Sequence, residues 1–309
     1  MSRIILAIIT LSLILNYASC TTAVSVKAGK DTAYGDYLTD GNGIALYMFQ
    51  NDSAGMTNCY TTCAVAWPPL TVASGATAAA GTGVTASMLG VITRTDGTKQ
   101  VTYNGWPLYY FTAELATKST IVGCQGITGS GGLWFIMNPN GKVNFTTKGR
   151  TANLASKNTL EMSTNTNLGV YLTDKDGVAL YVFGPDSFLK SNCADAQGCI
   201  AAWPPLTVAT GSTPTFGTGV DGSLVYWIKR ADGTIQVTYN GWPLYYYVGE
   251  IGKPGTINCQ NKNMHGGFWW IIKNDGTVIK TDASGPVTKH STLLTYGLGA
   301  FLVLLALLY

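Results

Sequence analysis

An internal duplication constrains the fold of this chain more than any other sequence feature. The segment QVTYNGWPLYY occupies residues 100–110 and recurs without change at residues 236–246. AWPPLTVA at residues 66–73 likewise recurs at residues 202–209. Because the copies keep their order and nearly their spacing, the chain is predicted to hold two homologous units.

The duplication also sets the predicted domain boundaries. Unit 1 covers residues 35–145, unit 2 covers residues 169–280, and a linker rich in Thr, Asn, Lys and Ser covers residues 146–168. A repeat of this length is too long for a stacked solenoid. Each unit is large enough to have its own core or to form half of a shared one.

Within each unit, short apolar runs alternate with turn signals. Asp96-Gly97 and Asn104-Gly105 in unit 1 have the counterparts Asp232-Gly233 and Asn240-Gly241 in unit 2. Both residues of such a pair can take positive φ angles, which makes the pairs strong hairpin signals. No sustained helical period appears between the terminal segments. We therefore predict an all-β protein of two duplicated, antiparallel, meander-rich β-domains, each a small sandwich or an open barrel.

Both ends of the chain carry targeting patterns. Residues 1–20 combine Arg3, an apolar run and small residues at their end, which predicts a secretory signal peptide. Residues 284–309 hold a polar spacer followed by an apolar tail, which predicts a removed glycosylphosphatidylinositol (GPI) signal with attachment at Ala283. A retained C-terminal transmembrane helix is the alternative. We expect the mature protein on the extracellular face of the cell membrane, held there by the lipid.

Charged residues are scarce. They make up 11% of the chain, against roughly a quarter in an average domain. Lys and Arg number 19 and Asp and Glu number 16, so no strong field is available to attract DNA, RNA or an anionic membrane. The composition argues against a nucleic-acid partner, a disordered tail and a coiled coil.

The cysteines are expected to form disulfides, because six remain after removal of the signal peptide from a secreted chain. They fall into two close pairs and one distant pair: Cys59 with Cys63, Cys193 with Cys199, and Cys124 with Cys259. The close pairs would close small loops, and the distant pair would join the two units or bond to neighbouring molecules. A zinc site is the alternative, but the sequence shows no repeated Cys/His cluster, so neither a metal nor a cofactor is predicted.

Residues suited to catalysis are few. His265 is the one His expected in the mature chain, which weakens the case for Ser-His-Asp or Cys-His chemistry. Four carboxyl groups are repeated between the units: Asp52, Glu114, Asp186 and Glu250. A carboxylate-based hydrolase or a calcium site would use such groups, but capping of turns or hydrogen bonding to Tyr explains them more simply. We therefore predict that the protein is not an enzyme.

Repeated aromatic residues are, with these carboxyl groups, the candidate ligand-binding residues. They are Tyr47, Trp67, Trp106, Tyr181, Trp203 and Trp242. Along residues 106–111, bulky side chains occupy both alternating faces, so one face can line a core and the other a second interface. That second face would stack on sugars, bind a partner protein or bury the contact between the units, and we favour the last.

Two Asn-x-Ser/Thr sequons, at Asn51 and Asn144, predict N-glycosylation. A glycan on Asn51 would shield the neighbouring segment of unit 1. Pro185 occupies the matching position in unit 2, which would leave a ligand site there more open.

The order of these motifs resembles that of a family of bacterial secreted lipoprotein repeats of unassigned function. Its Tyr-x4-Asp motif corresponds to residues 47–52 and 181–186, and a Cys pair, WPPL, RxDGTxQVTYNGWPLYY and a GG-x-W strand follow. The resemblance implies a secreted, membrane-attached tandem repeat and implies no activity. Cys20 matches the lipid-attachment site of such relatives weakly, so its lipidation is the alternative to the C-terminal anchor.

These features together predict a non-enzymatic, GPI-anchored cell-surface protein with a structural or adhesive role. A carbohydrate- or small-ligand-binding module that uses the Trp and Tyr surfaces is the second hypothesis, and a carboxylate-based hydrolase is the third. The expected partners are the membrane, through the lipid, and a glycan or protein at the cell surface.

Overall fold

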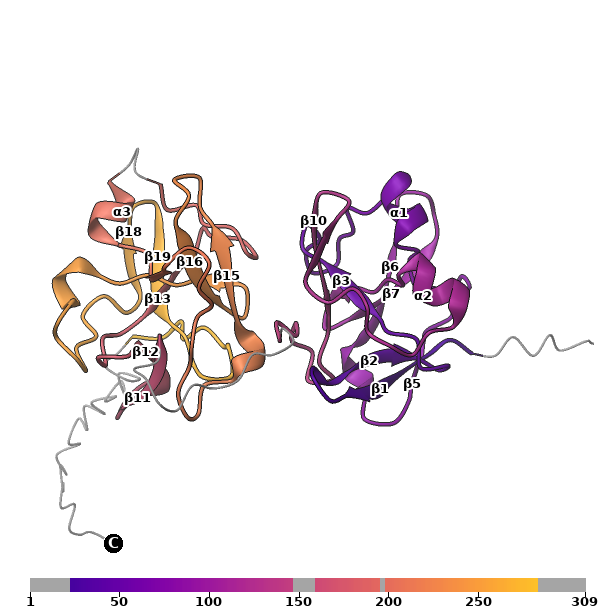
Figure 1. The fold of residues 1–309 in the computed structure, drawn as a ribbon, viewed down its shortest axis with the longest axis horizontal. Coiled ribbons are helices and arrows are strands. Elements are labelled where there is room, and N and C mark those ends of the chain that lie inside the picture. Colours follow the sequence, from indigo (N-terminus) through magenta and orange to yellow (C-terminus); the bar gives the residue numbers. More distant parts are fainter. Residues whose placement is uncertain (1–22, 147–158, 195–197, 283–309) are drawn as a thin grey trace, which may run out of the picture.

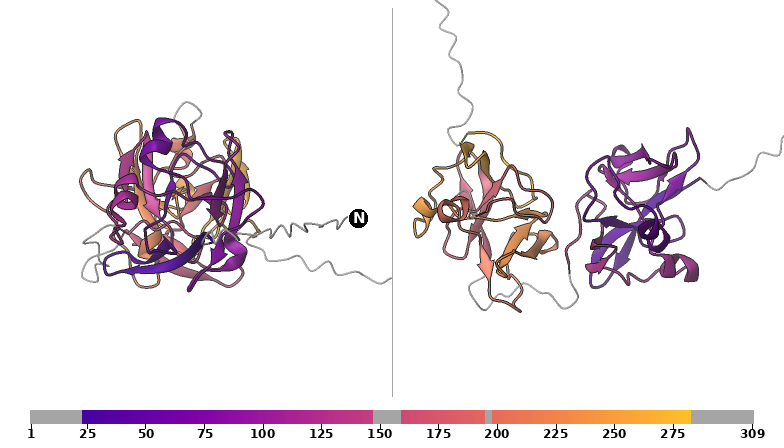
Figure 2. Two further views of the ribbon diagram at one scale, coloured as in Figure 1. Left: turned by 90° about the vertical axis from the view of Figure 1, so that its right-hand side faces the viewer. Right: turned by 90° about the horizontal axis from the view of Figure 1, so that it is seen from above.

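The computed structural model describes residues 23–146, 159–194 and 198–282, which form two β-rich lobes (Figure 1). Figure 2 shows the same lobes from the side and from above. Most strands are short and pair antiparallel, and the few helices are short. The prediction of an all-β fold with repeated domains is confirmed.

Unit 1 forms the first lobe, drawn in indigo to magenta in Figure 1. Its elements, in chain order, are β1 (Ser25–Asp31), β2 (Gly35–Asp40), β3 (Tyr47–Phe49), α1 (Thr62–Ala66), β4 (Thr71–Val72), β5 (Ala79–Ala80), η1 (Ala86–Met88), β6 (Leu89–Thr93), β7 (Lys99–Tyr103), β8 (Trp106–Pro107), α2 (Thr112–Thr117), β9 (Ile127–Gly129) and β10 (Gly132–Ile136).

Unit 2 forms the second lobe and repeats most of this order. Its elements are β11 (Leu160–Asn165), β12 (Gly169–Asp174), β13 (Tyr181–Phe183), α3 (Cys199–Ala202), β14 (Thr207–Val208), η3 (Gly222–Leu224), β15 (Val225–Lys229), β16 (Ile235–Tyr239), β17 (Trp242–Pro243), η4 (Val248–Glu250), β18 (Lys262–Met264) and β19 (Gly267–Ile271).

Small sheets build each unit. In unit 1, the strand orders are β2-β1-β5, β3-β10-β9 and β4-β7-β6, with β8 paired to β7. In unit 2, they are β11-β12, β13-β19-β18 and β14-β16-β15, with β17 paired to β16. The pairing of β1 with β5 is parallel, and the other strand pairs are antiparallel.

The predicted Asn-Gly turns form the hairpins that carry the repeated motif. Asn104 and Gly105 have φ angles of 48° and 84° between β7 and β8, and Asn240 and Gly241 have 48° and 79° between β16 and β17. Asn tolerates this left-handed conformation better than most residues and Gly does so freely. The turn therefore places Trp106 and Trp242 at equivalent positions, directly after it.

Two layers of core lie on either side of β3 and β10. Tyr47 and Trp134 point into a cluster that we call the Cys–Trp core, because it also contains Cys59, Cys63 and Cys124. Met48 and Phe135, the next residues along these strands, point into a second cluster of mainly Leu and Val, the Leu–Val core. Successive strand residues face opposite sides, so these strands are buried on both faces. Unit 2 has the same two cores.

The units extend beyond the boundaries that the motifs predicted. Strand β1 lies before residue 35, and β11 lies inside the segment predicted as linker, where it pairs with β12 along its whole length. Few identical residues connect β1 to β11, so comparison of the two halves missed them. The helices were also missed, because one or two turns are too short to show a helical period.

The two units share part of their core. Leu189 and Tyr226 of unit 2 belong to the Leu–Val core of unit 1. The Phe145 N–H donates a hydrogen bond of 2.6 Å to the Ser223 carbonyl, and the Phe145 ring stacks on Tyr226 with centroids 5.4 Å apart. Aromatic and aliphatic side chains thus form much of the contact between the units. The motif segment 106–111 has a smaller part in it than expected, because Leu108 and Tyr109, on its two faces, both lie in cores of unit 1, and Trp106 is the residue of the segment that contacts a ring of unit 2, Phe188.

Candidate functional site

The first repeated carboxyl group, Glu114, lies on α2 and points into the Cys–Trp core. Its two carboxyl oxygens accept hydrogen bonds from the Tyr47 hydroxyl at 2.9 and 3.0 Å, and Oε1 also accepts one from the Gly123 N–H at 2.8 Å. In unit 2, Tyr181 donates to Glu250 at 2.8 Å. Burial raises the pKa of both glutamates above the usual range. These hydrogen bonds hold the helical segment of each unit to its central strand.

The second carboxyl group, Asp52, belongs to another polar cluster under the disulfide loop. Its Oδ2 accepts a 2.7 Å hydrogen bond from the Tyr109 hydroxyl, and its Oδ1 accepts one of 2.7 Å from the Asn58 N–H. Buried Arg94 lies beside it and donates to the Gln100 side chain and to the Cys59 carbonyl, each at 2.7 Å. Desolvation raises the pKa of Asp52 to about 6.

Unit 2 repeats this second cluster with one substitution. Tyr245 donates to Asp186 at 2.8 Å, and its hydroxyl oxygen lies 2.7 Å from that of Ser191, where unit 1 has Thr57. Arg230 again bonds Gln236 and the carbonyl of the first disulfide Cys. Desolvation raises the pKa of Asp186 to about 7. The Tyr-x4-Asp motif thus supplies one residue to each of two separate clusters: Tyr bonds Glu, and Asp bonds a different Tyr.

The repeated Trp residues of the WPPL segments are core residues. Trp67 stacks on Trp134 with ring centroids 3.8 Å apart and an interplanar angle of 4°. Trp203 stacks on Trp269 in the same way, at 3.8 Å and 3°. All four rings are buried, so they pack the Cys–Trp core and do not form a surface for a ligand.

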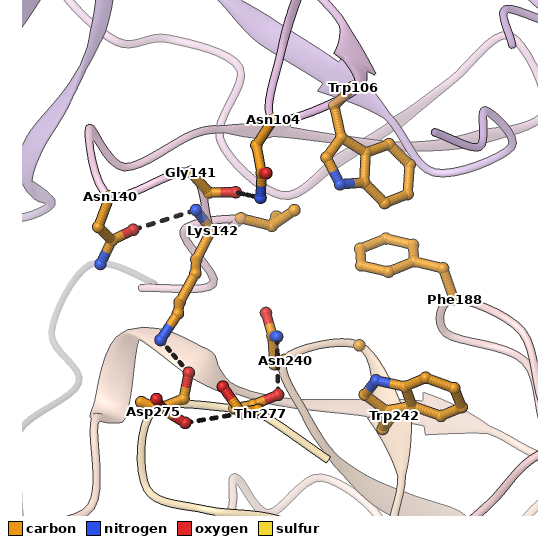
Figure 3. A pocket seen from close by; sticks show the side chains of 13 residues that line it. Asn104, Trp106, Asn140, Gly141, Lys142, Phe188, Asn240, Trp242, Asp275 and Thr277 are labelled. Atoms are coloured by element: carbon orange, nitrogen blue, oxygen red, sulfur yellow. Dashed lines mark hydrogen bonds between the residues drawn. The ribbon is translucent and has the colours of Figure 1, made fainter. Parts of the chain in front are cut away.

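Two other Trp residues, Trp106 and Trp242, remain half-buried and line a cleft between the units (Figure 3). The cleft has a volume of about 390 Å³. Asn104 and Trp106 face it from unit 1, and Asn240 and Trp242, their sequence equivalents, face it from unit 2. Phe188 lies between the two indoles, with its ring centroid 5.0 Å from that of Trp106.

The polar side of the cleft is formed by two equivalent turns. Residues 140–143 of unit 1 face residues 275–277 of unit 2. The Lys142 ammonium donates a hydrogen bond to the Asp275 carbonyl across the boundary (Figure 3). Asn104 donates to the Gly141 carbonyl at 3.0 Å, and Asn240 donates to the Gly276 carbonyl at 3.2 Å. Each unit therefore orients its amide against its own turn.

Comparison with family models agrees with the motifs. Residues 29–71, 90–125 and 227–273 match a family described as a secreted repeat of unknown function. These three segments of the chain are similar to this secreted repeat. The first two matched segments together span most of unit 1, and the third begins within β15 and runs to the end of β19 in unit 2. The suspected family is confirmed, and its description places the repeat among secreted proteins.

No curated protein and no solved structure showed significant similarity to the chain. The function of this secreted repeat must therefore be argued from its own residues.

The cysteines of the secreted repeat follow the prediction in part. Two short-range disulfides form, Cys59–Cys63 and Cys193–Cys199, with Cα atoms 5.2 and 5.4 Å apart. Cys124 and Cys259 are free and buried, which corrects the expectation that they form disulfides. Each lies in the Cys–Trp core of its own unit, where core side chains separate it from the other thiol and from neighbouring molecules.

The sequons differ in their suitability for a glycan. Asn51 is exposed, and its side chain donates to the Gly131 carbonyl at 3.2 Å. Asn144 is fully buried, and its Nδ2 donates to the Tyr34 carbonyl at 2.8 Å and to Asn138 at 2.9 Å. A glycan must be attached to that same nitrogen, so the folded structure contradicts the prediction of glycosylation at Asn144.

The terminal predictions fall outside the described residues: the signal peptide at 1–20 with Cys20, attachment at Ala283, and the tail at 284–309. In the part of the chain that the structure describes, every helix falls short of the length and hydrophobicity that a membrane crossing needs. Among the same residues, no group of three or more His, Cys, Asp and Glu side chains is placed to hold a metal ion.

Sequence reasoning missed the arginine clusters and the partners of Trp106 in the cleft. Arg94 and Gln100 both lie in the repeated RxDGTxQ block. Their spacing of six residues, on opposite sides of a predicted hairpin turn and identical in both units, is the signal that could have indicated the hydrogen bond between them. Phe188 has no repeated counterpart, since Ala54 occupies its position in unit 1. No comparison of the two halves would single it out as an interface residue.

Proposed function

We propose that the protein is a non-enzymatic extracellular protein whose two β-units have a structural or adhesive role at the cell surface. The supporting observation is that the repeated carboxyl groups are directed into the cores. Asp52 and Asp186 bond Tyr109 and Tyr245, and both carboxyl groups are less than a tenth exposed. A hydrolase needs a pair of carboxyl groups that reaches a substrate. Groups enclosed by core side chains are not placed to reach one.

The surface location rests on the ends of the chain and on the family. The signal peptide and the secreted repeat favour export, and the tail at 284–309 favours a GPI anchor at Ala283. A short-range disulfide beside each Cys–Trp core suits an oxidising compartment. The mature protein would then present two stapled β-units outside the cell.

Release from cells tests the anchor. The full chain is displayed on eukaryotic cells and treated with phosphatidylinositol-specific phospholipase C, with the Cys20→Ser variant as a matched control. We expect both forms to be released into the medium. Retention of both would contradict a GPI anchor and favour a transmembrane tail. Loss of membrane attachment in Cys20→Ser alone would place the lipid at the N-terminus.

A second experiment tests the structural assignment of the carboxyl groups. We expect Glu250→Gln to change thermal stability, because Glu250 is buried and bonded to Tyr181, while adhesion of the displaying cells, measured well below the unfolding temperature, stays unchanged. Asp36→Asn, at the exposed start of β2, serves as the control that alters neither. Turnover of a glycoside panel by the wild-type protein that disappears in folded Glu250→Gln would contradict the non-enzymatic proposal.

A further inference from the structure

The cleft between the units carries a feature that the structural role does not require, namely two partly exposed indoles. In each unit, the Trp residues that stack in the Cys–Trp core are buried, whereas Trp106 and Trp242 are half-buried. Both face the same cavity of about 390 Å³ (Figure 3). This volume lies within the range of roughly 300 to 1,000 Å³ that is typical of small-ligand pockets, which often form between domains.

The polar groups of the cleft are arranged in advance. The Nδ2 atoms of Asn104 and Asn240 are bound to the carbonyls of Gly141 and Gly276, which fixes the orientation of both amides. Within the described residues, their Oδ1 atoms accept no hydrogen bond. Two oriented acceptors therefore lie beside two aromatic surfaces, and a ligand with hydroxyl donors would satisfy them at little entropic cost.

The charges of the cleft balance. Lys142 is the cation at its wall, and its ammonium is bound to the Asp275 carbonyl. The Asp275 carboxylate accepts a 2.8 Å hydrogen bond from the Thr277 N–H. One cation and one anion, both engaged, give no net attraction for a charged ligand. The cleft therefore suits a neutral molecule.

We propose that this cleft binds a neutral oligosaccharide, one per chain. The C–H face of a sugar ring matches an indole surface, and sugar hydroxyls match the free amide oxygens and the exposed Thr277 hydroxyl. The binding residues come in equivalent pairs from the two units, so a single unit presents half of the site. This inference concerns the cleft and does not depend on how the protein is anchored.

Calorimetry and a glycan array test the proposal. The full chain is produced in a eukaryotic secretory host, and the mature product is used in whichever anchored or released form it takes. The probes are a panel of neutral and acidic oligosaccharides on the array, and then the best neutral one in solution. We expect neutral glycans to bind with a stoichiometry of about one per chain, because both units contribute to one cleft.

Variants locate the site. Trp106→Ala and Trp242→Ala are each expected to weaken binding roughly two- to tenfold, on the order of what one stacking aromatic ring contributes. Trp270→Ala is the matched control, since Trp270 is half-buried on β19 and does not line the cleft. Thr277→Tyr would fill the cleft from an exposed position without removing core volume, so it tests occupancy even where a Trp variant unfolds.

Several results would overturn the proposal. They are binding to no neutral glycan by folded protein, binding of acidic glycans or peptides alone, two sugars per chain, and unchanged affinity in both Trp242→Ala and Thr277→Tyr. A failed phospholipase release with intact sugar binding would refute the anchor and leave this site in place. The converse result would refute the site and leave the anchor in place.

Discussion

Replacement of the Asp186 carboxyl group should change how stability depends on pH. Burial raises its pKa from 3.8 to about 7. The folded protein therefore holds this proton more tightly than the unfolded chain, so the contribution to stability is complete below pH 4 and is lost as the pH rises to 7. A pKa difference of about three corresponds to about 4 kcal/mol in the free energy of unfolding.

The structure also indicates that Asn can replace Asp186 without breaking its contacts. The amide oxygen would accept the 2.7 Å hydrogen bond from the Asn192 N–H, and the amide nitrogen would donate to the Tyr245 oxygen. Tyr245 would then donate to the Ser191 hydroxyl, 2.7 Å away. Asp186→Asn therefore keeps position 186 uncharged and hydrogen-bonded at every pH.

Urea unfolding of the wild type and of Asp186→Asn between pH 4 and pH 8 measures the effect. We expect the variant to gain stability relative to the wild type as the pH rises, by about 4 kcal/mol across the range. Asp36→Asn is the control, because Asp36 is exposed at the start of β2 in unit 1 and does not belong to the Asp186 cluster. A variant and a wild type whose stabilities run parallel from pH 4 to pH 8 would refute the buried, proton-retaining carboxyl group.

Three further predictions test the rest of the structure. Trp67→Ala removes half of a buried stack and should lower the free energy of unfolding by about 3 to 5 kcal/mol in urea denaturation, while an equal effect of Trp270→Ala would contradict the packing. Cys124 and Cys259 should resist alkylation in the folded protein, because they are buried and burial raises their pKa to about 11. After denaturation without reductant, both thiols should be alkylated. If mass spectrometry finds neither labelled, the two form a third disulfide. Asn51→Gln should remove one glycan mass from protein made in a eukaryotic host and Asn144→Gln should remove none, whereas a mass loss in the second variant would show that Asn144 is glycosylated before it is buried.

The fold class followed from the sequence because its signals are local. Hairpins formed at the predicted pairs: Asn104 and Gly105 both take positive φ angles, whereas in Asp96-Gly97 only Gly97 does so. The disulfides of short separation were predictable for the same reason. The burial of Asn144 was not predictable, although its sequon is a local signal. Its burial depends on how residues far away in the sequence pack against it.

The candidate site was harder to predict because identical residues have different environments. Trp67 and Trp106 are both repeated and both adjoin Pro, yet one is stacked in a core and the other borders a cleft. Nothing within either motif separates these outcomes. The environment of each ring depends on the residue that packs against it. Trp67 stacks on Trp134 of its own unit, whereas Trp106 contacts Phe188 of the other unit.

The differences between the two copies explain why two similar units form one cleft. At four positions of the shared boundary, one copy has an aromatic residue and the other has a small or polar one: Phe188 against Ala54, Tyr226 against Gly90, Trp227 against Val91, and Phe145 against Lys280. The first three enlarge unit 2, and the fourth enlarges unit 1 to meet them, as the stacking of Phe145 on Tyr226 shows.

These differences provide the apolar area that holds the two units together. Two unmodified copies would present Ala and Gly to each other, with little apolar area to bury, and would not hold their Trp-bearing hairpins in place. The aromatic residues add apolar area that is buried at the boundary. The Asn-Gly-Trp turns, which are identical in the two units, then face each other across the cleft beside it. Duplication thus supplied the two halves of the cleft, and divergence at the neighbouring positions fixed them together.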